Sequence, residues 1–138
     1  MVDKNKVLNV LKNNNCSVIA TADLSGKSES AVMIHVYKDD LSLIMCTAPE
    51  TRKLKNISVN NKVSIVIGGF NNDPSVQMDG VARILNETEK AEAMAFVLNQ
   101  KPEMKDYGIE EEDFIIITPT WVRYIDYSQE PNIEEMSL

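Results

Sequence analysis

The stretch CTAPETRKLKNISVN contains the residues best suited to bind a ligand, Thr51, Arg52 and Lys53. The apolar spacing of Leu54 and Ile57 predicts a short helix that begins near Thr51. A helix dipole favours negative charge in its first turn, so the two cations oppose it. An anion at the helix N-terminus would resolve this conflict, because backbone N–H groups point outward there. Arg52 and Lys53 are therefore candidates for holding a phosphate, and the alternative is a solvated basic pair at a surface turn.

Few other residues offer catalytic chemistry. His35 is the only histidine, so neither a Ser-His-Asp triad nor a His-rich metal site can be assembled easily. Its alternation with Met33 and Tyr37 leaves two interpretations, a packed residue or a residue beside a bound ring. Gly68 and Gly69 belong to no phosphate-loop motif. We expect no metal site, and no residue stands out as a general acid or base.

The composition limits the classes of partner. The chain has 138 residues, with 21 acidic and 14 basic side chains and a formal net charge of -7. This balance argues against nucleic acid or an anionic membrane as a partner, because the protein would not neutralise their phosphates. No stretch approaches about 18 consecutive apolar residues, so no membrane span is expected. We expect one domain over residues 1–138, with residues 128–138 as a loose acidic tail.

The cysteines and the first residues bear on the compartment. Cys16 and Cys46 each stand alone in apolar surroundings, without CxxC spacing. Two buried free thiols in a reducing cytosol are favoured, and a disulfide is the alternative. The segment MVDKNKVLNVLKNNN lacks the apolar run of a signal peptide. We therefore expect a cytoplasmic protein.

Hydrophobic periodicity predicts strands with a few inserted helices. Asp3 is placed to cap a first helix, and Thr88 to cap a helix over 88–100 whose buried face would include Ala91 and Met94. Strands are predicted over 16–22, 30–37, 41–47, 62–70 and 75–85, and two more in FIIITPTWVRYIDY that break at Pro119. About seven mostly antiparallel strands favour a small closed or nearly closed barrel, because closure removes exposed strand edges.

The order of these pieces resembles the FMN-binding split barrel of the pyridoxamine 5'-phosphate oxidase-related proteins. Between Ala20 and Leu85 the chain shows, in the family's order, AT in the first strand, a glycine turn, an apolar second strand, DDLSLIMCT, TRKLKN, NKVSI and VQMDGVA. With the flanking helices, the resemblance covers most of the chain. It implies a mainly β (α+β) fold, a six- to seven-stranded antiparallel split β-barrel that binds FMN non-covalently.

The resemblance also implies individual contacts to the flavin. Arg52 and Lys53 would hold its phosphate, and the hydroxyl of Thr51 would add a donor. Further contacts would come from a pair at the end of the strand over 41–47, from the second strand and from one glutamine: Cys46 and Thr47; Val32, Met33, Ile34 and His35; and Gln77.

Two departures from the oxidase proper bear on activity. The flavin-contacting strand of the oxidase begins with Arg and ends with Lys, whereas this chain has Ala31 and Val36 at those places. The oxidase also has an Arg-Leu-His segment near its C-terminus that grips the phosphate of the vitamin, and nothing in this chain resembles it. The resemblance therefore implies a flavin-dependent oxidoreductase acting on an unidentified small molecule, rather than on pyridoxamine phosphate.

The expected assembly is a homodimer with the flavin in the cleft between its subunits. A flat isoalloxazine needs an apolar slot, and one small barrel cannot cover both of its faces. The cofactor would carry hydride or electron transfer, while the protein supplies binding and electrostatics. Three alternatives share the fold: a deazaflavin-dependent reductase, a haem-binding protein with His35 as axial ligand, and a non-enzymatic flavin carrier or sensor.

Overall fold

The computed structural model describes residues 2–128, 130 and 132–138, which form one antiparallel sheet with flanking helices. The longer helices are α1 (Lys4–Asn13), α2 (Arg52–Val59) and α3 (Glu87–Gln100), and short 3₁₀ helices lie at Phe70–Asn72, Pro102–Tyr107 and Ile109–Glu111. The strands are β1 (Cys16–Ala22), β2 (Ser28–Ile34), β3 (Val36–Tyr37), β4 (Leu43–Thr47), β5 (Lys62–Gly68), β6 (Ser75–Ile84), β7 (Asp113–Asp126) and β8 (Asn132–Ser137).

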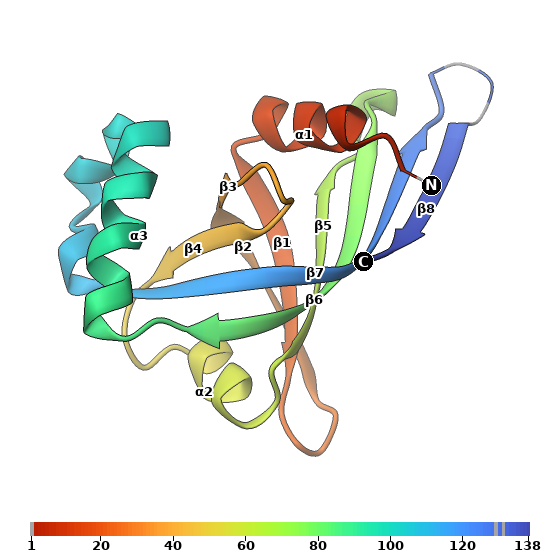
Figure 1. Cartoon of the computed structure of the whole chain (residues 1–138). Helices are drawn as coiled ribbons and strands as arrows, with labels where there is room; N and C mark the ends of the chain where they lie inside the picture. The colour runs from red at the N-terminus through yellow and green to blue at the C-terminus, as the bar shows by residue number, and fades with distance from the viewer. Residues whose placement is uncertain (1, 129, 131) are drawn as a thin grey trace.

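The sheet curls into a barrel that stays open on one side (Figure 1). Its strand order is β2-β1-β5-β6-β7-β4-β3, and β8 pairs with β7 outside this path. The strands at the two ends of this order, β2 and β3, follow each other in the chain and are separated only by His35. The chain therefore crosses from one end of the sheet to the other at His35, and the opening lies between β2 and β4, the partner of β3. The predicted antiparallel split barrel with flanking helices is confirmed.

Alternating side chains along the strands build the main core. In β5, for example, Val63, Ile65 and Ile67 are buried while the residues between them are more exposed. The apolar side of α1, predicted from its spacing and capped by Asp3, packs against this core. Figure 1 shows α1 across one end of the barrel, α2 at the opposite end and α3 to one side.

The helix α3 differs from its prediction in its cap and its buried face. Asn86 is the N-cap and forms a capping box with Glu89, so Thr88 already lies inside the helix. The buried residues are Ala93 and Val97, whereas Ala91 is exposed. The predicted face is right for Met94, which is partly buried against a second apolar cluster, and wrong for Ala91. Alanine-rich turns show weak amphipathicity, so packing against this cluster decides which residues are buried.

The predicted break at Pro119 is wrong, because β7 runs through it as one strand. The register with β6 shifts at this point, where Asp79 pairs with Trp121 and Gly80 with Pro119. On its other side, β7 pairs with β4 up to Ile117 and with β8 from Trp121, so Pro119 lies between two partners and interrupts neither ladder. A Cβ on Gly80 would lie 2.8 Å from the Ile117 side chain, so glycine permits this close pairing.

The expectation of a loose tail over 128–138 is also wrong in its larger part. Residues 132–137 form β8, which pairs antiparallel with β7 from Asp126↔Asn132 to Trp121↔Ser137. A salt bridge from Lys6 Nζ to Glu134 Oε2 (2.7 Å) ties this strand to α1. Residues 129 and 131 of the predicted tail lie outside the described residues.

Candidate functional site

The N-terminus of α2 brings together the three residues predicted to hold the phosphate, Thr51, Arg52 and Lys53, and one further predicted flavin contact, Thr47. Lys53 Nζ donates to Thr47 Oγ1 at 2.9 Å, and Thr47 Oγ1 lies 3.5 Å from Thr51 Oγ1. Thr51 is the N-cap in extended conformation, yet among the described residues its side chain makes no capping hydrogen bond. The first turn also holds no acidic residue. Its backbone N–H groups therefore remain available to an anion.

A hollow of about 340 Å³ opens beside this helix end and connects it with β1 and β2. Its walls come from three segments: Ile19 and Thr21 of β1, Glu29, Ser30 and Ala31 of β2, and the run from Glu50 to Lys53. Glu29 Oε2 lies 3.1 Å from Arg52 Nε, so an acidic group shares the hollow with the cations. Sequence reasoning missed Glu29, although it lies two positions before Ala31 on the same side of the strand.

Two opposing effects act on the pKa of Lys53. Desolvation lowers the pKa of Lys53, and the carboxylate of Glu112 raises it in part. Burial raises the pKa of Glu112 in turn. A phosphate beside Lys53 would favour its charged form, because an opposite charge counteracts desolvation.

Cys46 points away from the candidate phosphate-site residues. It packs in the apolar cluster around α3, which includes Ile34, while Thr47 lies on the other side of β4. Burial raises the pKa of the Cys46 thiol to about 12, so the thiol is neutral and a poor nucleophile at neutral pH. Both cysteines are free, as the favoured interpretation had it, but Cys16 is exposed and Cys46 is half-buried rather than buried.

His35 lies in the interior between β2 and β3, fully removed from solvent. Its Nε2 is 2.9 Å from the carbonyl oxygen of Leu11, and since a carbonyl only accepts, Nε2 carries the proton. Burial lowers the pKa of His35 to about 4. The structure thus presents His35 as a packed neutral histidine and does not place it in the hollow beside α2.

The remaining predicted residues are divided between the two sides of the sheet. Met33 faces the core, whereas Val32 is 70% exposed on the outer side. Residues paired across neighbouring strands point to the same side of the sheet. Val32, Val18, Val66 and Gln77 form such a row across β2, β1, β5 and β6, so Gln77 lies on the outer side too. A single copy therefore does not bring Gln77 and the candidate phosphate-site residues onto the same side.

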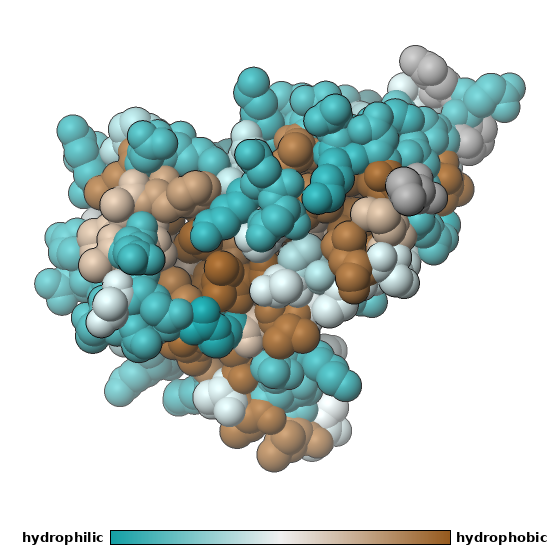
Figure 2. Space-filling view, viewed as in Figure 1, coloured by the Kyte–Doolittle hydropathy of each residue, from teal (hydrophilic) through white to brown (hydrophobic). Residues whose placement is uncertain are grey.

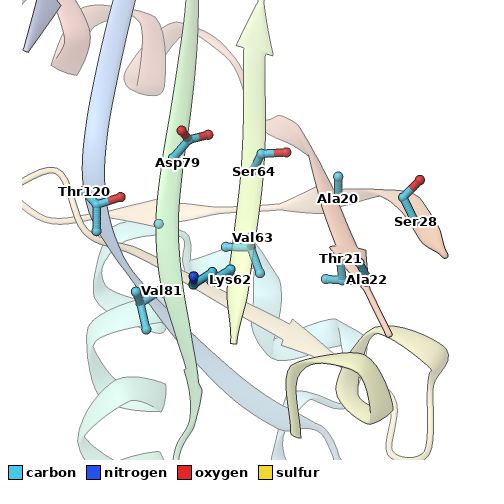
Figure 3. Close-up of a pocket in the computed structure, with 11 residues that line it drawn as sticks. Ala20, Thr21, Ala22, Ser28, Lys62, Val63, Ser64, Asp79, Val81 and Thr120 are labelled. Carbon is cyan, nitrogen blue, oxygen red and sulfur yellow. The ribbon is translucent and has the colours of Figure 1, made fainter. Parts of the chain in front are cut away.

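The outer side carries a second hollow of about 490 Å³, formed by neighbouring strands (Figure 3). Figure 3 shows Asp79, Ser64 and Ala20 on β6, β5 and β1, with Thr120 of β7 at one end. Val66 and Val81 are exposed on this side of the sheet. Figure 2 shows another apolar area at the lower end of the molecule, over the β1–β2 hairpin and α2, where Leu24 and Val59 are exposed.

Two other kinds of feature, a metal site and a membrane-spanning helix, are absent from the described residues. These residues contain no group of three His, Cys, Asp or Glu side chains arranged to hold a metal ion. None of the helices within the described ranges is both long and apolar enough to cross a membrane.

The fold and the uncapped, basic N-terminus of α2 define a split-barrel protein with a candidate phosphate site. A family model described as pyridoxamine 5'-phosphate oxidase matches residues 4–126. The chain belongs to the pyridoxamine 5'-phosphate oxidase family. A comparison with curated proteins finds no significant match.

Solved structures share this fold at low sequence identity. General stress protein 26 from Bacillus anthracis has 20% identity and a TM-score of 0.72, with 96% of this chain and 98% of that chain covered. A heme binding protein from Mycobacterium smegmatis has 17% identity and a TM-score of 0.79, with coverage of 99% and 60%. A protein related to general stress protein 26 from Clostridium acetobutylicum has 14% identity and a TM-score of 0.78, with coverage of 99% and 97%.

Proposed function

We propose that this protein binds FMN non-covalently and acts as a flavin-dependent oxidoreductase on a small molecule. The observation that carries the proposal is the convergence of Lys53, Thr47 and Thr51 at the uncapped N-terminus of α2, with Arg52 beside them. Hydroxyl, ammonium, guanidinium and backbone N–H groups are the donors that a phosphomonoester requires. The free thiols of Cys16 and Cys46 fit a reducing, cytoplasmic setting.

The neighbouring strand offers polar groups for the flavin ring. Within the described sheet, β2 pairs with β1, and its other edge faces the opening of the barrel. Backbone N–H and C=O groups at a free strand edge can donate to and accept from a planar heterocycle. Bound FMN would supply the redox chemistry, while this chain binds the phosphate, orients the ring and excludes water from it.

The absorption spectrum tests the cofactor directly. We expect the purified protein, alone or after addition of FMN, to show flavin bands near ~450 nm. A protein that remains colourless and does not bind FMN in a titration would contradict the proposal. A shifted deazaflavin spectrum or a Soret band would instead assign one of the related cofactors. The haem alternative has the weaker structural support, because the chain's single histidine, His35, is buried and bonded to Leu11.

We further propose that the active form is a homodimer formed through the outer side of the sheet. Gln77 and the hollow beside α2 lie on opposite sides of one barrel, so two copies are needed to bring both to one flavin. Exposed Val32, Val66 and Val81 provide an apolar surface for such a contact. A second barrel would also cover the ring face that the first leaves open.

We expect the protein to sediment as a dimer at micromolar concentration, and FMN to raise its melting temperature by linkage. Val66→Asp should shift the equilibrium towards monomer by at least roughly tenfold, because it buries an unpaired charge. Tyr107→Asp is the matched control, since Tyr107 is exposed in a 3₁₀ helix away from the sheet. Sedimentation velocity with and without FMN measures both effects. A wild-type monomer that binds FMN tightly would rule out the shared cleft.

A further inference from the structure

Glu29 places a negative charge inside the proposed phosphate site. Only 15% of its side chain is exposed, and its Oε2 lies 3.1 Å from Arg52 Nε. The same oxygen is 3.4 Å from Nδ2 of Asn56, a buried residue of α2 whose amide also donates to Thr21 Oγ1 at 3.0 Å. The carboxylate is therefore held in place by the helix that would bind the phosphate. It already forms an ion pair with Arg52, one of the two cations of the site.

We propose that Glu29 competes with the ligand phosphate for Arg52, so that it weakens binding of phosphomonoesters and speeds their release. This inference rests on the proposed function, because it concerns the same site. In the structure, Arg52 Nε is paired with Glu29. When a phosphomonoester arrives, the guanidinium turns from the carboxylate to the phosphate, and Glu29 keeps its hydrogen bond from Asn56.

The two cations of the site differ in a way that supports this exchange. The Arg52 side chain is 72% exposed, so its pairing with Glu29 is screened by water and easily broken. Lys53 donates to the neutral hydroxyl of Thr47, and a phosphate does not have to displace a carboxylate from it. Glu29 therefore limits how much Arg52 contributes to the affinity for the phosphate. The contribution of Lys53 does not depend on Glu29.

The competition is tested by a double-mutant cycle with Glu29→Gln and Arg52→Ala. Glutamine keeps the shape of Glu29 and an oxygen that can accept from Asn56, but it removes the charge. We expect Glu29→Gln to tighten FMN binding roughly three- to tenfold, mainly through slower release. Most of this gain in affinity should disappear when Arg52 is alanine, because the cation for which Glu29 and the phosphate compete is then missing. Isothermal titration and stopped-flow fluorescence measure the affinity and the release rate.

Two other ligands, riboflavin and inorganic phosphate, and a second acidic residue serve as controls that distinguish competition for Arg52 from general charge repulsion. Riboflavin has no phosphate, so Glu29→Gln should leave its affinity unchanged. Glu50→Gln removes a charge from the same hollow, but among the described residues Glu50 forms no ion pair with Arg52. Its gain in FMN affinity should therefore be much smaller than that of Glu29→Gln. An equal gain from both glutamine variants, or a gain that persists in Arg52→Ala, would mean general repulsion and would overturn the competition.

A loss of affinity in Glu29→Gln would also overturn it, since Glu29 would then orient Arg52 for the ligand. Inorganic phosphate distinguishes this proposal from the flavin assignment. If wild type does not bind FMN but Glu29→Gln binds inorganic phosphate more tightly, and only with Arg52 present, the competition holds and the flavin assignment fails. If neither protein binds FMN or phosphate, both proposals are wrong.

Discussion

Arg52→Ala and Lys53→Ala should each weaken FMN binding roughly 10- to 150-fold, the loss expected when a charge-assisted hydrogen bond to the phosphate is removed. Riboflavin should bind these variants as it binds wild type, because it lacks the phosphate. Lys53→Arg should also weaken FMN binding, since a planar guanidinium does not replace the compact ammonium that reaches Thr47 Oγ1. Isothermal titration of both ligands against each variant gives the comparison.

Lys55→Ala is the matched control for these variants. Lys55 belongs to α2 and is exposed, so this substitution changes the net charge by the same amount without touching the hollow. It should change FMN affinity by less than about twofold, as expected for an exposed charge. If FMN affinity stays within about threefold of wild type in both Arg52→Ala and Lys53→Ala while the fold is intact, the pair is a solvated surface feature and the phosphate site is wrong.

Acid should destabilise the protein through His35. The folded pKa of about 4 lies below the ordinary value of 6.5, so the unfolded chain binds the proton more readily. The stability associated with the neutral ring is complete above pH 6.5 and is lost as pH falls towards 4. This interval corresponds to roughly 3 kcal/mol of unfolding free energy. Urea unfolding between pH 7 and pH 4.5 measures the slope.

His35→Gln provides the comparison for this effect. Its amide can still donate to the Leu11 carbonyl oxygen but does not titrate. The variant should lose most of the pH dependence between pH 5 and 6.5, whatever its stability at pH 7. Hydrogen bonds from nearby serines lower the pKa values of Asp23, Asp40 and Asp126 from 3.8, so these carboxylates act at lower pH and do not obscure the comparison. Parallel curves for wild type and variant would show that His35 does not titrate on unfolding.

Several elements could be predicted from the sequence because their signals are local. The short apolar run CSVIATA, bounded by turn residues, predicted β1 with the bounds that the structure has, and Asp3 marked the start of α1. The cations of TRKLKN pointed to the N-terminus of α2, where Lys53, Thr47 and Thr51 converge. Such patterns predict structure reliably because hydrophobic periodicity and helix capping depend on residues only a few positions apart.

Other features depend on partners far away in the sequence. The strand β8 exists because β7 presents a free edge to an acidic segment that has no strong strand signal of its own. Pro119 could not be predicted to lie within β7, since its tolerance depends on where β4 ends and β8 begins along the same edge. The hydrogen bond that sets the tautomer of His35 likewise involves the carbonyl of Leu11, 24 positions away.

The sequence by itself determined the family, the antiparallel barrel pattern and the two cations that begin α2, because period, spacing and charge are properties of neighbouring residues. Only the tertiary structure decided that Glu29 reaches Arg52 and that Gln77 lies on the other side of the sheet from the hollow. These arrangements depend on strand register and helix docking, in which a shift of one residue moves a side chain to the opposite side of the sheet.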